Sequence, residues 1–158
     1  IYVSNTIGDA AFDLWQLNSN DSPDNSCLNR LNRPMPQVEM GRSLVSIASA
    51  CIDISDGLEQ DLSHILTSSK VGAIIEVDKI PMSPLLTDYV GRDGDYSLVL
   101  NGGDDYELCF TVPEKNQVAL SRISKHCGAK ITQIGVICES GGLEIVGAKN
   151  AGKSYQHF

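Results

Sequence analysis

Residues 51–58 read CIDISDGL, a short apolar run that ends in two aspartates, a serine and a glycine. The run has the length of a strand, and Gly57 permits a tight turn out of it. The residues that follow place apolar side chains at helical spacing, at Leu58, Leu62, Ile65 and Leu66. We therefore expect a strand, a turn that carries carboxylates and an amphipathic helix, which is a repeating unit of α/β domains.

The alternation of strands and helices continues on both sides of this unit. Strands are expected over residues 1–4, 72–77, 106–112, 131–136 and 143–146, and helices over 7–14, 38–50, 85–90 and 114–126. The first helix is expected to bury a face that includes Ala10 and Leu14, and the strand over 106–112 alternates as a half-buried strand does. Residues 18–36 are expected to form an exposed loop and a proline-containing connection. The sequence thus predicts one α/β (α+β) layered domain over residues 1–158, with a mixed sheet flanked by helices.

Composition excludes several classes of function. The chain has 158 residues, with 12 Lys and Arg against 20 Asp and Glu, so its formal net charge is −8. It lacks the surplus of basic residues on which binding to nucleic acids or to anionic membranes depends. If the protein handles phosphates, divalent cations must supply the positive field. The first residues lack a basic segment of the kind that opens a signal peptide, and we expect a cytoplasmic protein.

The turn after the first strand has two readings. Asp53 and Asp56, three residues apart with Ser55 between them, offer the oxygen ligands that Mg²⁺ prefers, at the end of a strand where ligands of α/β sheets usually bind. Alternatively, Ser55 or Asp56 merely caps the next helix. The turn does not match a calcium EF-hand or an Asp-x-Asp phosphatase pair, because the required residues or spacing are absent.

Two further stretches carry weaker signals. Residues 101–107 read NGGDDYE, in which paired glycines allow a ligand to approach the backbone and adjacent acids can hold a cation; the same string is also typical of a hairpin turn. The turn at Gly8 and Asp9 opens a helix whose N-terminus could bind an anion, although Asp9 opposes this. The five cysteines are expected to be small buried hydrophobic residues, and the three histidines surface residues.

Together, three stretches closely resemble the C-terminal half of bacterial thiamine-monophosphate kinase. They are CIDISDGL at 51–58, DLSHIL at 61–66 and GGDDYELCFTVP at 102–113. The resemblance extends to residues 1–9, to NRPMP at 32–36 and to SYQHF at 154–158. It implies the fold of the aminoimidazole ribonucleotide synthetase superfamily, in which an N-terminal domain precedes a C-terminal domain of this type and homodimers form through the N-terminal domains.

The resemblance also implies an activity and a site. The family uses ATP and Mg²⁺ to phosphorylate thiamine monophosphate directly to thiamine diphosphate. Asp53 and Asp56 match its metal-binding aspartates, Ser55 matches a residue that contacts ATP, and Asp104 and Tyr155 match positions that contact the substrate. Two departures stand out: Asp104 is often Glu in relatives, and Gly152 stands where relatives can carry Trp.

Because the family's N-terminal half is missing from this chain, we expect the isolated segment to be folded but inactive. The alternatives are another ATP-dependent enzyme of the same superfamily, of the selenophosphate synthetase or aminoimidazole ribonucleotide synthetase type, and a non-catalytic acidic binding module in which both loops are caps and turns.

Overall fold

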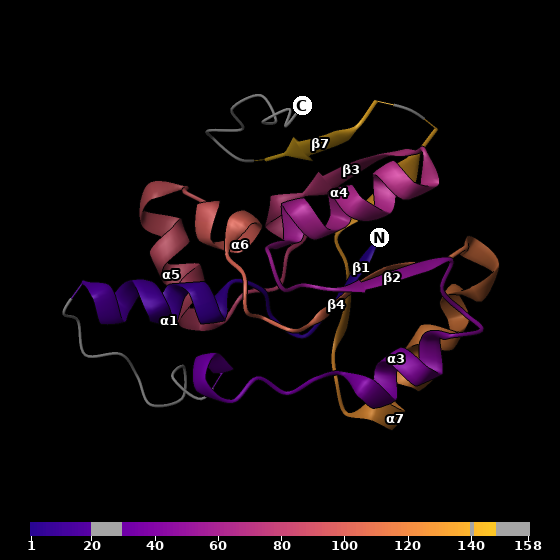
Figure 1. The fold of residues 1–158 in the computed structure, drawn as a ribbon, viewed down its shortest axis with the longest axis horizontal. Coiled ribbons are helices and arrows are strands. Elements are labelled where there is room, and N and C mark those ends of the chain that lie inside the picture. Colours follow the sequence, from indigo (N-terminus) through magenta and orange to yellow (C-terminus); the bar gives the residue numbers. More distant parts are fainter. Residues whose placement is uncertain (20–29, 140, 148–158) are drawn as a thin grey trace.

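The strands form two sheets (Figure 1). In the computed structural model, which describes residues 1–19, 30–139 and 141–147, the larger sheet is antiparallel with the order β2-β4-β1-β5. Its strands are β1 (Tyr2–Ser4), β2 (Ala50–Asp53), β4 (Leu108–Thr111) and β5 (Ile131–Gln133). The smaller sheet has the order β6-β3-β7, from β3 (Gly72–Glu76), β6 (Gly135–Cys138) and β7 (Leu143–Val146). In the smaller sheet β3 pairs antiparallel with β6 and parallel with β7, so this sheet is mixed. The predicted α/β fold class is confirmed, and the strands are divided between two sheets.

Helices cover both faces of the larger sheet. The described helices are α1 (Asp9–Asn18), α3 (Val38–Leu44), α4 (Leu58–Ser69), α5 (Pro84–Asp93), α6 (Ser97–Asn101) and α7 (Leu120–Cys127), with 3-10 turns η1 (Val77–Lys79) and η2 (Glu114–Ala119). Figure 1 shows α3 and α7 on one side of this sheet, and α4 with the smaller sheet on the other. One apolar cluster joins Tyr2 and Phe110 to α3 and α7, and a second joins Val3 and Cys109 to α4 and β3. The domain therefore has two cores that share one sheet.

The first strand, the helix after residues 51–57 and the strand β7 lie where the sequence predicts them. All four apolar positions expected to face inward from α4 are buried, at Leu58, Leu62, Ile65 and Leu66. In α1 the expected face is partly wrong. Ala10 is buried, but Leu14 is 47% exposed, and Phe12 and Asp13 are buried instead. The face is rotated because Phe12 packs on Tyr89 of α5, with ring centroids 5.2 Å apart.

The strand over 106–112 was expected to be half buried, and this is wrong. Cys109 and Phe110 point to opposite faces, and both are fully buried. The reason is the position of β4 inside the larger sheet, between β2 and β1, where helices cover both faces. As a consequence Glu107, at the start of the strand, is only 4% exposed.

The strand expected over 131–136 is in fact two strands in two sheets. The chain leaves the larger sheet after Gln133 and enters the smaller one at Gly135. At the crossing, the N–H of Ile134 donates to the carbonyl of Ile1, and the carbonyl of Ile134 accepts from Glu76. A Cβ atom at position 135 would lie 2.1 Å from the carbonyl oxygen of Ile74, so only glycine fits there.

The loop expected over 18–36 lies partly outside the described residues; residues 30–32 are helical, and Arg30 is only part exposed. In the part of the chain that the structure describes, no helix combines the length and the apolar character needed to cross a membrane.

Of the described cysteines, Cys109 is buried as expected, whereas Cys51 is exposed on the edge strand β2. His64 and His126 are exposed as expected.

Candidate functional site

The loop between β2 and α4 presents its acidic side chains to solvent. Asp53 and Asp56 are exposed, and Ser55 is part exposed. Helix α4 begins after Gly57, and no side chain caps its N-terminus. The alternative in which Ser55 or Asp56 acts only as a helix cap is therefore wrong. Of these side chains, only that of Asp56 has a hydrogen-bond partner among the described residues, the exposed amide of Gln60 at 3.2 Å.

The second acidic loop connects α6 to β4 and lies directly against the first. Its backbone donates from Asp104 N to the carbonyl oxygen of Ser55 at 3.0 Å, and from Tyr106 N to that of Ile54 at 2.9 Å. In return Ile54 N donates to the carbonyl oxygen of Glu107 at 2.7 Å. Residues 102–107 therefore form no hairpin turn. They are joined by three backbone hydrogen bonds to a loop about fifty positions away in the sequence.

A glycine makes this contact possible. A Cβ atom at position 103 would lie 2.3 Å from the carbonyl oxygen of Ser55, a distance that real Cβ contacts do not reach. The sequence predicted that the paired glycines allow a ligand to approach the backbone; at Gly103 the group that approaches is instead the backbone of the neighbouring loop. The two loops thus share one edge of the larger sheet.

Tyr106 of the second loop interacts with acidic side chains of both loops. Its hydroxyl donates to a carboxylate oxygen of Asp104 at 3.3 Å. The charge of Asp104 is the main cause that raises the pKa of the Tyr106 phenol, and the charges of Asp53 and Asp56 raise this pKa further. The charges of three predicted site carboxylates therefore act on one phenol, and of the three Asp104 alone contacts it directly.

This donor set fits Mg²⁺. The available groups are carboxylate and hydroxyl oxygens, and Mg²⁺ is typically bound by one or two carboxylates together with waters and substrate phosphates. Among the described residues there is no group of three or more His, Cys, Asp or Glu side chains that could hold a metal by itself. Asp53 and Asp56 would thus hold a cation only with ligands from outside these loops.

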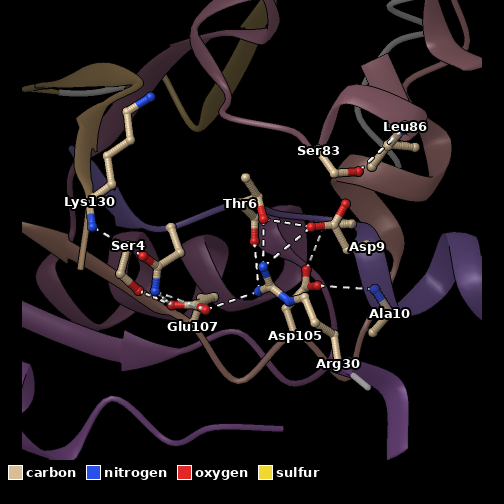
Figure 2. A network of polar contacts seen from close by, with 12 residues as sticks. Ser4, Thr6, Asp9, Ala10, Arg30, Ser83, Leu86, Asp105, Glu107 and Lys130 are labelled. Atoms are coloured by element: carbon tan, nitrogen blue, oxygen red, sulfur yellow. Dashed lines mark hydrogen bonds and ion pairs between the residues drawn. The ribbon is translucent and has the colours of Figure 1, made fainter. Parts of the chain in front are cut away.

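Behind the second loop lies a buried network of charges (Figure 2). Arg30 binds Glu107 through Nη2 at 3.0 Å and Asp9 through Nη1 at 3.3 Å. Glu107 also accepts from the hydroxyl of Ser4 and the amide of Asn5. Burial raises the pKa of Glu107, while its hydrogen bond from Ser4 and the charge of Arg30 oppose that shift. The network ties the start of β4 to β1, to α1 and to the segment that contains Arg30.

Asp105 fills the anion position that the sequence suggested at the start of α1. Its carboxylate accepts from the backbone N–H of Gly8 at 2.7 Å and of Ala10 at 3.5 Å. The helix N-terminus thus binds a carboxyl group of the chain itself. Asp105 is 5% exposed, and burial raises the pKa of its carboxyl to about 7. Asp104 and Asp105 therefore face opposite ways, one toward solvent and one toward α1.

Sequence reasoning did not assign roles to Arg30, Asp61 and Glu107. Asp61 follows Leu58 by three positions and so lies on the inward face of α4, which was a usable signal. Glu107 lies on the same strand face as Cys109 and Thr111. Recognising that this face is buried would have located Glu107. Nothing local singles out Arg30, because its partners lie 21 and 77 positions away. Tyr155 and Gly152 lie outside the described residues.

Comparison with family models finds no match. Among curated proteins, the thiamine-monophosphate kinase of Haemophilus influenzae is 40% identical over 146 residues, which cover 90% of this chain and 44% of the relative. That of Escherichia coli K12 is 41% identical over 140 residues, covering 85% of this chain and 43% of the relative. The chain thus spans less than half the length of these relatives.

Solved structures show the same correspondence. The crystal structure of the thiamine-monophosphate kinase from Stenotrophomonas maltophilia superposes with a TM-score of 0.85 at 37% identity, over 92% of this chain and 49% of that one. A complex of AaThiL with AMPPCP and TMP superposes with a TM-score of 0.77 at 29% identity, over 99% of this chain and 50% of that one. In sequence and in fold, the chain corresponds to the C-terminal half of the thiamine-monophosphate kinase family.

Proposed function

We propose that this chain is the C-terminal half of a thiamine-monophosphate kinase, which transfers the terminal phosphoryl group of ATP to thiamine monophosphate. The single observation that carries the proposal is the joining of the two acidic loops by three backbone hydrogen bonds, which places the loop of Asp53 and Asp56 against the loop of Asp104. The identity to curated kinases and the fold shared with a complex that contains an ATP analogue and TMP support it.

Within this proposal each loop has its own task. Asp53 and Asp56 hold Mg²⁺, and Ser55 contacts ATP. Asp104 and Tyr155 contact the substrate. Bound Mg²⁺ would neutralise the phosphate oxygens during transfer. The chain's own residues position the reactants, and no side chain of this half needs to form a covalent intermediate.

The remaining ligands are proposed to come from an N-terminal domain. Two exposed aspartates make an incomplete site, and the match to the Haemophilus influenzae kinase covers only 44% of that relative's length. We propose that the complete protein is a cytoplasmic homodimer joined through the N-terminal domains. Sedimentation of the complete protein tests the dimer, and a monomer would contradict it.

The kinase proposal is tested by measuring thiamine diphosphate formed from ATP and thiamine monophosphate, with and without Mg²⁺. We expect Mg²⁺-dependent turnover by the complete protein and none by residues 1–158 alone. Asp53→Asn and Asp56→Asn should each reduce turnover at least about 100-fold, because each removes a ligand charge. The exposed Asp88→Asn, on α5, serves as the control.

Two outcomes would contradict the proposal. Absence of thiamine diphosphate with the complete protein rejects the activity. Turnover by residues 1–158 alone rejects the need for a second domain. Calorimetry of this chain with Mg²⁺ and thiamine diphosphate separates a binding module from an inert segment, and heat that is lost in Asp53→Asn assigns the binding to this loop.

A further inference from the structure

Asp61 is a buried carboxylate whose hydrogen bonds point away from its own helix. It is 2% exposed and lies in the first turn of α4. One of its oxygens, Oδ2, accepts from the backbone N–H of Ser55 at 2.9 Å and from that of Asp56 at 3.1 Å. These two residues precede the helix and belong to the loop that carries the exposed acids. A single oxygen thus holds two consecutive peptide groups of this loop.

The loop has few other restraints on this side. Gly57, where the loop joins α4, has φ +117 and makes no side-chain cap. On the opposite side, the carbonyl oxygens of Ile54 and Ser55 accept from the second loop. The peptide groups at 55 and 56 therefore have their N–H groups fixed by Asp61 and their neighbouring carbonyls fixed by residues 104–106. Removing Asp61 leaves two donors without a partner and frees one side of the loop.

Asp61 is not itself placed to bind a ligand. Its side chain is buried, whereas Asp53 and Asp56 are exposed. Its backbone N–H continues α4 by donating to the carbonyl of Gly57 at 2.9 Å, so its position is set by the helix. A carboxylate held in this way can act on the exposed acids only through the backbone between them.

We propose that Asp61 is a positioning residue, which aligns Asp53, Ser55 and Asp56 for cation binding by hydrogen bonding the peptide groups of Ser55 and Asp56. The proposal rests on the function proposed above and adds a residue to its machinery. Groups that orient metal ligands from behind typically contribute about 10–100-fold to affinity or activity. The role requires a hydrogen-bond acceptor at position 61 and does not require its charge.

The test measures Mn²⁺ binding to the complete protein by electron paramagnetic resonance, because Mn²⁺ is a paramagnetic substitute for Mg²⁺ with the same preference for oxygen ligands. Asp61→Ala should weaken Mn²⁺ binding about 10–100-fold. Asp61→Asn, which keeps one acceptor oxygen at the same reach, should restore binding to within about threefold of the parent. In the complete protein, Asp61→Ala should raise the Mg²⁺ concentration for half-maximal turnover and leave the KM for thiamine monophosphate within about twofold.

Two control variants separate positioning from other effects. Glu59→Ala removes an acid from the same first turn but not the contact with the loop. Leu66→Ala removes a buried side chain from the same helix and lowers its stability. Both should keep Mn²⁺ affinity within about twofold of the parent. Should Asp61→Ala fail to fold, Asp61→Leu replaces it, because Leu has a similar size and lacks both oxygens.

Each outcome decides the question. If Asp61→Ala, or Asp61→Leu in its place, binds Mn²⁺ with the affinity of the parent, the proposal is overturned. It is also overturned if Asp61→Asn binds Mn²⁺ as weakly as that variant, because the charge at position 61 would then be required. Lack of Mn²⁺ binding by the complete parent protein overturns it together with the metal site. Binding that follows the expected order, without turnover by the complete protein, supports the role of Asp61 and rejects only the kinase activity.

Discussion

Asp104 and Tyr106 both adopt a left-handed backbone, with φ 66 and φ 52, on either side of the buried Asp105. This conformation is unfavourable for residues with a side chain, more so for Tyr than for Asp. It is maintained by the hydrogen bonds of both residues to the first loop and by those of Asp105 to α1. The strained turn directs Asp104 outward and Asp105 inward. Strain of this kind is typical of functional loops.

At the residue scale, the first prediction concerns the contact at Gly103. Gly103→Ala places a Cβ atom where the carbonyl of Ser55 lies 2.3 Å away, so the loops must separate. We expect the free energy of unfolding to fall by about 1–3 kcal/mol and turnover of the complete protein to fall by more than the loss of folded protein explains. Urea unfolding and the kinase assay measure the two effects. Gly91→Ala is the control, because apart from its chain neighbours and its own helix backbone no atom lies within 4 Å of a Cβ at this position.

The second prediction concerns pH and Asp105. The folded protein holds the proton on Asp105 up to about pH 7, whereas the unfolded carboxyl loses it near 3.8. The folded state therefore binds more protons between these values, so its stability falls as pH rises through this window. Glu107, whose pKa is also raised, contributes with the same sign.

Asp105→Asn cannot ionise, so the decline in stability between about pH 4 and about pH 7 should be smaller in this variant, by at most about 4 kcal/mol. Urea unfolding at a series of pH values measures it. The exposed Asp88→Asn should keep the parental decline. An equal decline in Asp105→Asn and the parent would show that Asp105 ionises normally in the folded state.

At the scale of elements, Arg30 joins parts of the chain that have no strand pairing between them. Its guanidinium binds Asp9 of α1 and Glu107 at the start of β4. Arg30→Met leaves two buried carboxylates without this cation. We expect a loss of about 2–4 kcal/mol in the free energy of unfolding, below that of a fully buried pair because Arg30 is 31% exposed.

The loss should be larger at pH 8 than at pH 5, since the pKa of Glu107 is raised by burial and its carboxylate is more fully charged at the higher pH. Arg42→Met, which removes a pair whose side chains are 75% and 68% exposed, should change stability by less than about 1 kcal/mol. If both variants lose the same amount, the Arg30 network does not stabilise the fold.

Element by element, the sequence predicted best where periodicity and burial agree. The inward face of α4 was correct in full because its pattern is repeated over three turns. The α1 face was partly wrong because an aromatic contact with α5, distant in sequence, rotates it. The short helix α6 was not expected, because five residues are too few to show a helical period.

At the scale of the whole molecule, one continuous segment links the two sheets. Residues 131–138 pair with β1 in the larger sheet and with β3 in the smaller one. Gly135→Ala places a Cβ atom 2.1 Å from the carbonyl oxygen of Ile74, and the two sheets cannot both keep their pairing. We expect a loss of about 3 kcal/mol or more in the free energy of unfolding.

Thermal unfolding followed by circular dichroism measures this loss. Gly41→Ala, on α3, is the control: its nearest neighbour is a flexible Leu108 methyl at 3.9 Å, so the variant should be as stable as the parent or slightly more so. An unchanged midpoint in Gly135→Ala would mean that the crossing accommodates a side chain.

The sequence by itself determined the class of the fold, most of its strands and helices, and the family it matches. These follow from local periodicity and from motifs of adjacent residues. It also singled out Asp53, Ser55, Asp56 and Asp104 as candidate site residues, and their roles remain predictions.

Only the tertiary structure decided how these parts combine. It placed residues 53–57 beside residues 102–107, buried Asp61, Asp105 and Glu107, and brought Arg30 between two carboxylates. It also divided one expected strand between two sheets. The physical reason is that burial and backbone pairing depend on segments far apart in the chain, whose approach no local pattern encodes.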